Sequence, residues 1–449
     1  MDHAIPSADL PARFARSRAL TERARRVLAG GVSSQFRAAT AFHPMFFDRA
    51  EGARIWDADG NELLDFTLAQ GPMILGHSHP EVLARVGAAV ARGQLYAGQH
   101  EAELELAEAI QRLVPCAERL RFASSGSEAA HACLRLARTV TGKPGWIKFE
   151  GHYHGWLDAV AWNVAPPPPG SNAAAAGDDA LDPVPWCEGV PRSAGEDVVV
   201  LPWNDLDRVA RVLAARGHEI GALITEPVMC NQGCIEPEPG FLQGLRDLCT
   251  RHDVALIFDE IITGFRIAPG GAGARYGVTP DLALFGKALG SGFPIAAIAG
   301  TRRFMAPLEE GRSYHAGTLN GNNACVAAAA ATLDVLTRDD AAAHRRIVAL
   351  GTRLRDGLAA AGAESGLPVR VQGPGPMFWM GFLDRPLRDA RDVGAADAAR
   401  GRDFAARLLL EGVRIIERGL WYVSAAHTEA DVDAAVAAAR RALADMAAA

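Results

Sequence analysis

Two stretches, ALIFDEIITGF at 255–265 and DLALFGKALGSG at 281–292, decide the fold of this chain. Each contains a run of apolar residues, which is typical of a strand buried on both faces of a sheet. Each run gives way to a break that contains glycine, and a charged residue, Asp259 or Lys287, stands near the point where the run ends. Because the carboxyl ends of parallel strands meet at one edge of a sheet, we expect both side chains to project from that edge.

The rest of the chain predicts two lobes around this sheet. A single hydrophobic core stops growing well below 449 residues. From about residue 80, helical stretches alternate with short apolar strands, which indicates an α/β fold with a mainly parallel sheet covered by helices. We therefore expect a large ligand-binding domain at 81–330. The segment 1–80 and the α/β pattern of 331–449 should form a smaller domain.

Composition and charge narrow the classes of function. The net charge of −7, without blocks of like charge, gives no reason to expect nucleic acid or an anionic membrane as a partner. The N-terminal stretch lacks the apolar core of a secretory signal, and no run reaches the roughly 20 apolar residues of a membrane span. Seven cysteines, an odd number, indicate reduced thiols and predict a cytoplasmic protein.

The combination of Lys287 and Asp259 predicts pyridoxal phosphate (PLP) chemistry. A lysine in an apolar, glycine-rich stretch can form an imine with the aldehyde of this cofactor. A nearby carboxylate keeps the pyridine nitrogen protonated, so that the ring draws electrons from a substrate carbon. The ordinary alternative for Lys287 is a surface lysine whose stem lies on apolar residues. Since alternate strand residues point to opposite faces, we expect only one of Asp259 and Glu260 to face inward.

A serine-rich segment, SSGS at 124–127, stands between a predicted strand and a predicted helix. The opening of such a helix offers unpaired amides and the positive end of its dipole to a phosphate. Taken alone, the pattern fits a plain N-cap better, because serines before a helix mostly serve as caps.

Other polar residues follow predicted strands. Tyr153 stands between His152 and His154, where an aromatic ring suits the face of a planar cofactor. The two histidines lack further ligands at metal-binding spacing, so we predict no metal site. Glu226 and Asn231 follow the next strand, where each either contacts a ligand or satisfies the loop backbone.

In their order along the chain, these motifs resemble the class III (fold-type I) PLP-dependent aminotransferases, and within them the glutamate-1-semialdehyde 2,1-aminomutase branch. The resemblance covers nearly the whole chain. It rests on GGVSSQFRA, GPMILGHSHP, RFASSGSEA, FEGHYHG, ITEPV, FDEIITGFR, YGVTPDLALFGKALGSGFP, HAGTLNGN and VSAAHTEADVD. It implies a large domain with a seven-stranded sheet, and a homodimer whose active sites lie at the subunit interface.

The resemblance also implies roles for individual residues. Lys287 would carry the cofactor, and Asp259 would pair with its ring nitrogen. Tyr153 and Ile261 would cover the two ring faces. The remaining cofactor contacts would come from Ser125, Gly126, Ser127, Asn231 and, from the neighbouring subunit, Thr318.

Departures from the aminomutase pattern lie around the substrate. Gln70 stands where that pattern has Trp and Gly419 where it has Glu, while Arg37 matches an arginine that binds a substrate carboxylate. Relatives that act on β-amino acids or arylglycines share FEGHYHGW and an Arg-Gly pair, which makes Arg418 a second carboxylate candidate, with a surface salt bridge as the alternative. Glu226 completes the substrate-side candidates. A Pro/Ala-rich insert at 164–197 replaces the lid segment of the pattern and is either a lid or a disordered insert.

These features predict a PLP-dependent aminotransferase. It would move an amino group from an amino acid, such as a β-amino acid or an arylglycine, to a 2-keto acid by a ping-pong mechanism. The alternative is glutamate-1-semialdehyde 2,1-aminomutase, which uses the same machinery within one molecule and needs no keto-acid acceptor. A remote third hypothesis is a protein that binds PLP without catalysing a reaction.

Overall fold

The structure, a computed structural model, describes residues 12–38, 42–165 and 179–448. It divides the chain into two compact units. Unit 1 comprises Met1–His79, Arg346–Pro386 and Ala396–Ala449, and unit 2 comprises Pro80–Arg345 and Leu387–Ala395. The sequence-based limits at residues 80 and 330 stay a prediction of the domain division. Among the described helices, none combines the length and the apolar character needed to span a membrane.

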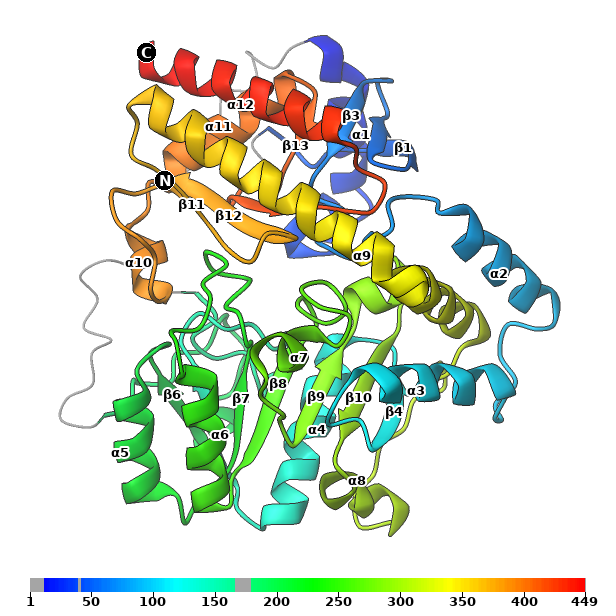
Figure 1. Ribbon diagram of the computed structural model, residues 1–449, viewed down its shortest axis with the longest axis vertical. Coiled ribbons are helices and arrows are strands. Elements are labelled where there is room, and N and C mark those ends of the chain that lie inside the picture. Colours follow the sequence, from blue (N-terminus) through cyan, green and yellow to red (C-terminus); the bar gives the residue numbers. More distant parts are fainter. Residues whose placement is uncertain (1–11, 39–41, 166–178, 449) are drawn as a thin grey trace. The chain divides into compact units, whose positions relative to one another are not determined.

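Unit 2 is built on a seven-stranded sheet, which confirms the predicted α/β class (Figure 1). Every neighbouring pair is parallel except the two that involve the last strand of this sheet along the chain, which runs antiparallel to both of its neighbours. The central strands are buried at every position, as expected for a sheet that is covered on both faces. The order across the sheet is β4 (Arg119–Ala123), β10 (Ala296–Gly300), β9 (Leu282–Phe285), β8 (Ala255–Glu260), β7 (Ile220–Thr225), β5 (Gly145–Phe149) and β6 (Val198–Leu201).

Helices alternate with these strands, as the sequence pattern predicts. The first helix after β4 packs against β7, β8, β9 and β10 through small residues such as Ala129, Ala130 and Cys133, so its first turn lies at the carboxyl edge of the sheet. The helices of unit 2 are α2 (Pro80–Ala91), α3 (Glu101–Leu113), α4 (Gly126–Thr141), α5 (Leu206–Arg216), α6 (Phe241–His252), α7 (Gly271–Tyr276), α8 (Arg302–Glu309) and α10 (Ala390–Ala395). Short 3-10 turns lie at η5 (Arg192–Gly195) and η6 (Lys287–Gly290). Helix α9 (Asn323–Ser365) begins in unit 2 and ends in unit 1, with non-helical geometry from Arg338 to Ala341.

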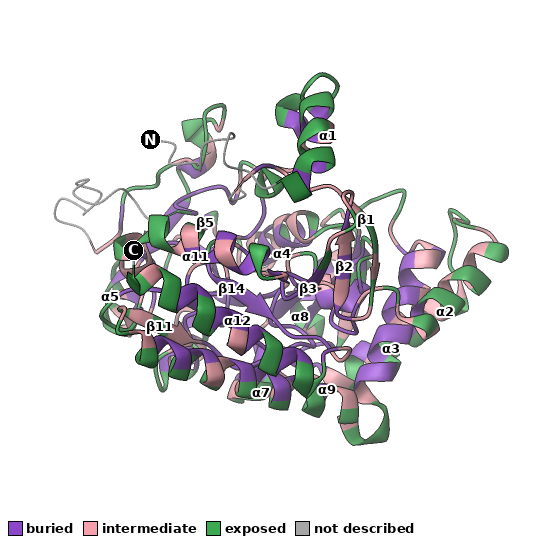
Figure 2. Ribbon diagram, turned by 90° about the horizontal axis from the view of Figure 1, so that it is seen from above, coloured by how far each residue is buried: buried purple, intermediate pink, exposed green. Residues whose placement is uncertain are grey.

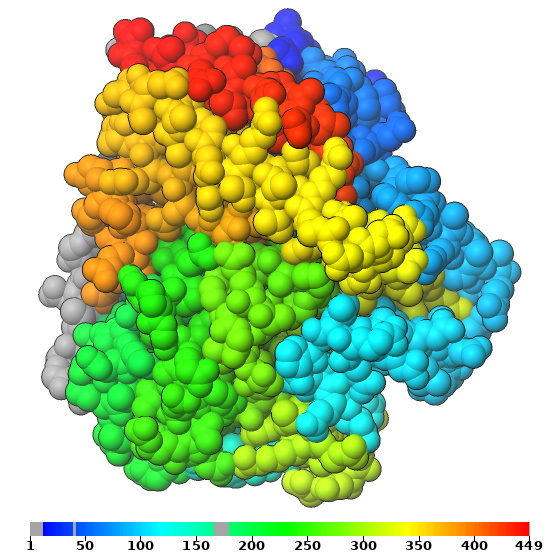
Figure 3. Space-filling view, viewed as in Figure 1, coloured from blue at the N-terminus to red at the C-terminus, as the bar shows by residue number. Residues whose placement is uncertain are grey.

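Unit 1 contains two smaller sheets. One has the order β1 (Phe47–Glu51), β2 (Arg54–Asp57), β3 (Glu62–Asp65) and β13 (Val413–Arg414), and the other β11 (Val369–Gln372), β12 (Met377–Phe382) and β14 (Leu420–Tyr422). The turn at Asp59–Gly60 joins the antiparallel strands β2 and β3. Strand β13 pairs in parallel with β3, so the N-terminal and C-terminal parts of the chain share one sheet, and they lie side by side in blue and red (Figure 3).

The helices of unit 1 bury one side and expose the other (Figure 2). In α12, for example, Val432, Val436 and Leu443 are buried while charged residues between them face solvent. The helices and 3-10 turns of this unit are η2 (Ala12–Phe14), α1 (Ala15–Arg25), η3 (Ala29–Gly31), η4 (Gln35–Arg37), α11 (Ala398–Leu410) and α12 (Glu429–Ala448).

Candidate active site

The ends of β8 and β9 bring Asp259 and Lys287 to the same edge of the sheet. The two strands are parallel neighbours, and Asp259 is level with Leu284, three residues before Lys287. Lys287 opens η6 with a φ of 45°, a left-handed conformation that costs a non-glycine residue roughly 1–2 kcal/mol. Backbone strain of this kind is concentrated at functional sites.

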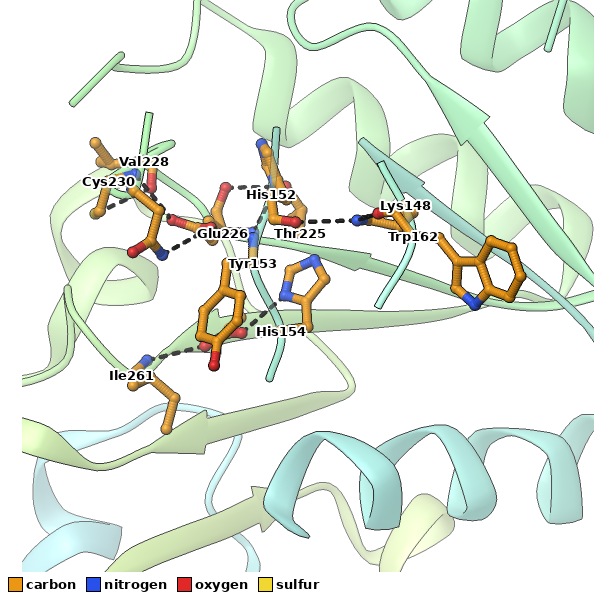
Figure 4. A network of polar contacts seen from close by, with 12 residues as sticks. Lys148, His152, Tyr153, His154, Trp162, Thr225, Glu226, Val228, Cys230 and Ile261 are labelled. Carbon is orange, nitrogen blue, oxygen red and sulfur yellow. Dashed lines mark hydrogen bonds and ion pairs between the residues drawn. The ribbon is translucent and has the colours of Figure 1, made fainter. Parts of the chain in front are cut away.

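Asp259 is a buried carboxylate with two hydrogen-bond partners. Nδ1 of His154 lies 2.8 Å from its Oδ2 atom, and the amide of Ile261 donates to Oδ1 at 3.1 Å (Figure 4). Burial raises the pKa of Asp259 to about 7, whereas the Ile261 amide and the charge of Lys287 lower it. A cation that binds here would therefore stabilise the ionised carboxylate.

Glu260 is also buried, which shows that the expectation of a single inward-facing carboxylate is wrong. Its Oε2 atom accepts the amide of Ala272 at 2.7 Å and the hydroxyl of Thr263 at 2.6 Å, and its Oε1 atom accepts the amide of Gly273 at 2.9 Å. Since both faces of the sheet are covered, strand alternation here separates two buried environments.

The loop after β5 is tied to the loop after β7. The amide of Glu226 donates to Nδ1 of His152 at 3.0 Å, and the amide of Tyr153 donates to Oε1 of Glu226 at 2.8 Å (Figure 4). The first bond places the ring proton of a neutral His152 on Nε2. The two bonds fix the backbone on both sides of His152.

The carboxylate of Glu226 accepts further N–H groups from its own loop. Its Oε2 atom accepts the amides of Cys230 at 2.9 Å and Asn231 at 3.3 Å, and its Oε1 atom accepts Nδ2 of Asn231 at 3.2 Å. Burial and the charge of Asp259 raise the pKa of Glu226 to about 7, while the hydrogen bonds from Tyr153 and Asn231 lower it. The observed contacts of Glu226 and Asn231 shape the loop, and their ligand contacts stay predictions.

The phosphate-loop candidates stand at the start of α4, where Ser125 is the N-cap. Its hydroxyl donates to Oε2 of Glu128 at 3.0 Å and accepts the Glu128 amide at 3.3 Å, so Ser125 caps the first turn of the helix. The structure thus confirms that Ser125 is an N-cap. Gly126 and Ser127 supply first-turn amides, which a helix leaves without partners inside the helix.

Three segments converge closely at this helix start. A Cβ atom at Gly126 would lie 2.9 Å from Cδ1 of Ile261, and one at Gly155 would lie 2.5 Å from Oγ of Ser127. Gly155 also has a φ of 108°, which disfavours any side chain. The loop that carries Tyr153 therefore approaches the start of α4 only because glycine stands at 155.

Trp186 is a neighbour of Tyr153 that sequence reasoning missed. The two ring centroids are 5.6 Å apart at 68°, an edge-to-face contact. Trp186 belongs to the 164–197 insert, of which residues 166–178 lie outside the described residues. Its amide donates to the carbonyl of Ala161 at 2.9 Å, and Asn163 and Val184 exchange bonds of 2.8 Å, which fixes this part of the insert. An isolated Trp in a Pro-rich segment was the available signal.

His154 was assigned no function by sequence reasoning, and the structure places it on Asp259. Burial and then the charge of Lys148 hold the pKa of His154 well below its ordinary value. The ring is therefore neutral and donates its Nδ1–H to Asp259. No group of three or more His, Cys, Asp or Glu side chains arranged for a metal ion occurs in the described parts of the chain.

Three substrate candidates belong to unit 1, and two of them are in contact. Nη2 of Arg418 lies 3.4 Å from Oε1 of Gln70, and the guanidinium carbon lies 5.7 Å from the ring centroid of Phe36. Arg37 is exposed at the end of η4. Thr318 lies in an exposed turn of unit 2. The roles of these residues stay predictions.

Curated relatives match along almost the whole chain. Glutamate-1-semialdehyde 2,1-aminomutase of Desulfitobacterium hafniense (strain Y51) is 40% identical over 423 residues, which cover 93% of this chain and 95% of the relative. The protein of the same name from Chloroflexus aggregans is 40% identical over 447 residues, which cover 97% and 99%.

Solved structures with the same fold include several transaminases. An ω-transaminase from Sphaerobacter thermophilus matches with a TM-score of 0.90 at 33% identity, covering 96% of this chain and 98% of the other. A transaminase with PLP bound matches with a TM-score of 0.86 at 30% identity, covering 97% and 98%. A β-phenylalanine aminotransferase from Variovorax paradoxus matches with a TM-score of 0.82 at 31% identity, covering 94% and 92%.

The family model named Aminotransferase class-III matches residues 36–435, which include every site residue described above. Together with relatives at 40% identity over more than nine-tenths of the chain, this match establishes the family. The protein therefore belongs to the class III aminotransferases.

Proposed function

We propose that this enzyme binds PLP at the carboxyl edge of its seven-stranded sheet and transfers an amino group from an amino acid to a 2-keto acid. The observation that carries the proposal is Asp259, a buried carboxylate at the same sheet edge as Lys287. Burial raises its pKa to about 7, so the ionised form gains most from a cationic partner. A protonated pyridine nitrogen is such a partner.

The surrounding residues fit the rest of this cofactor. The first-turn amides of Gly126 and Ser127, at the positive end of the α4 dipole, suit a phosphate. Ile261 packs close to Gly126, and Tyr153 offers an aromatic face. When bound, PLP draws electrons from the substrate carbon that carries the amino group.

Three residues of the chain would have distinct roles in the reaction. Lys287 would hold the cofactor covalently and, once an amino donor has displaced it, carry a proton on Nζ to and from the substrate carbon. Asp259 would keep the ring nitrogen protonated. An ion pair that shifts this nitrogen by ~2 pKa units is worth about 2.7 kcal/mol, enough to fix its protonation at neutral pH. His154 would orient the Asp259 carboxylate through its Nδ1–H.

The names of similar proteins and the geometry at Gly419 bear on the choice between transamination and the aminomutase reaction. The curated relatives support the aminomutase alternative better than transfer between molecules, because those named above are aminomutases at 40% identity. Among the similar solved structures, some are named as transaminases, one of them for β-phenylalanine, and one is named as a glutamate-1-semialdehyde aminomutase.

The geometry at Gly419 favours transfer between molecules. Gly419 stands where the aminomutase pattern has Glu, and its φ is 91°. A Cβ atom there would collide with the carbonyl oxygen of Met380 and lie 2.8 Å from Nε1 of Trp379. A glutamate side chain does not fit this backbone, while Arg418 beside it offers a fork for a carboxylate, in keeping with a β-amino acid or arylglycine substrate.

Half-reactions separate the candidates. The PLP form is incubated with α-, β- and ω-amino donors alone, its absorbance is followed, and pyruvate or 2-oxoglutarate is then added. A transaminase is converted to the aminated form by the donor and restored by the keto acid. Turnover of glutamate 1-semialdehyde without any acceptor, with no conversion by other donors, would identify the aminomutase. Failure of every donor would support a protein that holds PLP without catalysis.

We also propose a homodimer in which Thr318 contacts the phosphate of the neighbouring subunit. Two large residues flank it on the surface, Tyr314 at 77% and Leu319 at 58% exposure, as at a protein interface. Light scattering on the purified protein should give the mass of two chains. Thr318→Ala should weaken PLP binding without changing this mass, whereas a monomer with full PLP affinity would contradict the proposal.

The cytoplasmic location predicted from the sequence is also proposed here. The seven cysteines are reduced, and six of them are buried. Reduced thiols are typical of that compartment. Localisation of a tagged chain in its host cell would test this.

A further inference from the structure

Lysine is rare in this chain. The sequence contains three lysines, Lys143, Lys148 and Lys287, among 46 Lys and Arg residues. An ammonium is a compact donor with three N–H bonds, whereas a guanidinium is a larger planar fork. Where this arginine-rich chain has a lysine, the site therefore suits a compact ammonium group better than a guanidinium.

Lys148 lies on β5 and is completely buried. Its Nζ atom donates to the carbonyl oxygen of His152 at 3.0 Å and to that of Trp162 (Figure 4). These two residues stand at the two ends of a loop that also carries Tyr153 and His154. One ammonium group thus fastens the loop at both ends.

The charge of Lys148 also acts on the two histidines. Burial first, then Lys148, holds the pKa of His154 well below its ordinary value, and Lys148 acts on His152 in the same direction. Burial lowers the pKa of Lys148 itself to about 7, while Glu226 and Glu150 raise it. Below pH 7, where an ordinary histidine takes up a proton, Lys148 is therefore charged and opposes that uptake.

We propose that Lys148 is a positioning residue for Asp259: it holds the His152–Trp162 loop in place and keeps His154 a neutral hydrogen-bond donor to the Asp259 carboxylate. A neutral His154 leaves the negative charge of Asp259 for a bound cation, whereas an imidazolium would neutralise that charge. The inference rests on the proposed binding of PLP at Asp259.

Other ionisable groups surround this pair, and the test must separate them from His154. Glu226 follows β7, Lys287 follows β9, and the thiol of Cys133 on α4 faces Asp259. Burial raises the pKa of Cys133, so this thiol stays neutral. Burial also raises the pKa of Glu226 to about 7, so Glu226 changes charge in the same pH range as the proposed effect.

The first experiment needs no variant of Lys148. In wild-type apoprotein with 15N-labelled histidine, the His154 signals are identified by their absence in His154→Gln. We expect His154 to stay neutral, with its proton on Nδ1, at pH values where an ordinary histidine is already protonated. A wild-type His154 that titrates near its ordinary pKa overturns the proposal.

The second experiment removes the charge and keeps a donor. In Lys148→Gln, the pKa of His154 should rise, and PLP should bind about tenfold more weakly than to wild type at pH 6, with little difference at pH 8. In a His154→Gln background, the same substitution should lose most of this pH dependence, and the part that remains comes from the titration of Glu226, Asp259 and Lys148 themselves. This comparison separates the contribution of His154 from theirs.

Lys143→Gln is the matched control. Its Nζ atom also donates to two carbonyls, those of His252 at 2.8 Å and Asp253 at 3.0 Å, but they lie at the end of α6. This variant should bind PLP like wild type at both pH values. An equal loss of affinity in Lys148→Gln at pH 6 and pH 8, or a His154 that stays neutral in it, overturns the proposal.

Failure of the proposed function gives a different result. A wild-type protein that does not bind PLP at all contradicts the binding site, while the histidine titration still supports or overturns the role of Lys148. Should Lys148→Gln fail to fold, the wild-type titration decides alone.

Discussion

His154 and Asp259 form a buried pair in which Nδ1 lies 2.8 Å from Oδ2, with side-chain exposures of 0% and 5%. The pair joins the loop after β5 to the end of β8, across 105 positions of sequence. Its neutral donor satisfies one carboxylate oxygen without cancelling the charge. The site is thereby prepared for a cation that the chain itself does not fully supply.

Asp259→Asn should reduce turnover by at least about 100-fold, because the variant no longer holds the ring nitrogen protonated. PLP should still be held through Lys287 and the start of α4, with an affinity about tenfold lower than in wild type, because the charge of Asp259 is lost. Amino-donor half-reactions followed by absorbance measure this directly.

Glu260→Gln is the control on the same strand. It removes a buried carboxylate from the opposite face, so stability should fall by about 1–3 kcal/mol while turnover of the folded protein is kept. Unchanged turnover in Asp259→Asn would refute the assignment.

The raised pKa of Asp259 has a consequence for the stability of the apoprotein. A carboxyl with a pKa of about 7 in the folded chain and its ordinary value of 3.8 when unfolded binds its proton more tightly when folded. Its contribution is present below the unfolded pKa and is lost as pH rises through about 7. Wild-type apoprotein should therefore lose melting temperature relative to Asp259→Asn between pH 5 and pH 8. The opposite trend would show that the carboxylate is stabilised without a bound cation.

Gly155→Ala should lower both stability and PLP affinity, because its Cβ atom would lie 2.5 Å from Oγ of Ser127 and its φ of 108° is strained. The matched control is Gly142→Ala at the other end of α4. Gly142 has a φ of 71°, and a Cβ atom added there would meet nothing within 4 Å beyond the adjacent residues. This control should cost about 1 kcal/mol of stability and leave PLP affinity unchanged. Equal PLP affinity in the two variants would remove the argument for close approach at Gly155.

Arg418→Ala should raise the KM for amino donors that carry a carboxylate by about 10- to 100-fold, because a charge-assisted bidentate contact is lost. Amine donors without a carboxylate should be little affected. Arg370→Ala, an exposed arginine whose Nη2 donates to the carbonyl of Asp384, serves as the control in the same unit. A similar KM change for both donor classes would show that Arg418 supports the structure of unit 1 and does not bind the substrate carboxylate.

The sequence was most informative where side chains follow strand ends. The placement of Lys287, Asp259 and Tyr153 just at or after strand ends could be predicted because apolar runs mark the strands, and the edge of a parallel sheet places their ends together. The α4 cap at Ser125 was predicted as an alternative, because serines before a helix mostly serve as caps, and the Glu128 amide donates to its hydroxyl in the structure.

Contacts between distant segments could not be predicted in this way. The pairing of His154 with Asp259 and the contact of Trp186 with Tyr153 join loops whose paths depend on tertiary packing. The burial of Glu260 was missed because alternation places it on the opposite face of the strand from Asp259, and that face is covered as well. The left-handed φ of Lys287 likewise has no signal in residue type, since lysine does not favour it.

Borohydride reduction of the PLP-loaded protein, followed by digestion and mass spectrometry, tests the central claim most directly. With three lysines in the sequence, the attachment point is unambiguous. The reduced cofactor should be found on the peptide that contains Lys287, and the label should disappear in Lys287→Ala. A label on Lys143 or Lys148, or no label in wild type, would contradict the account.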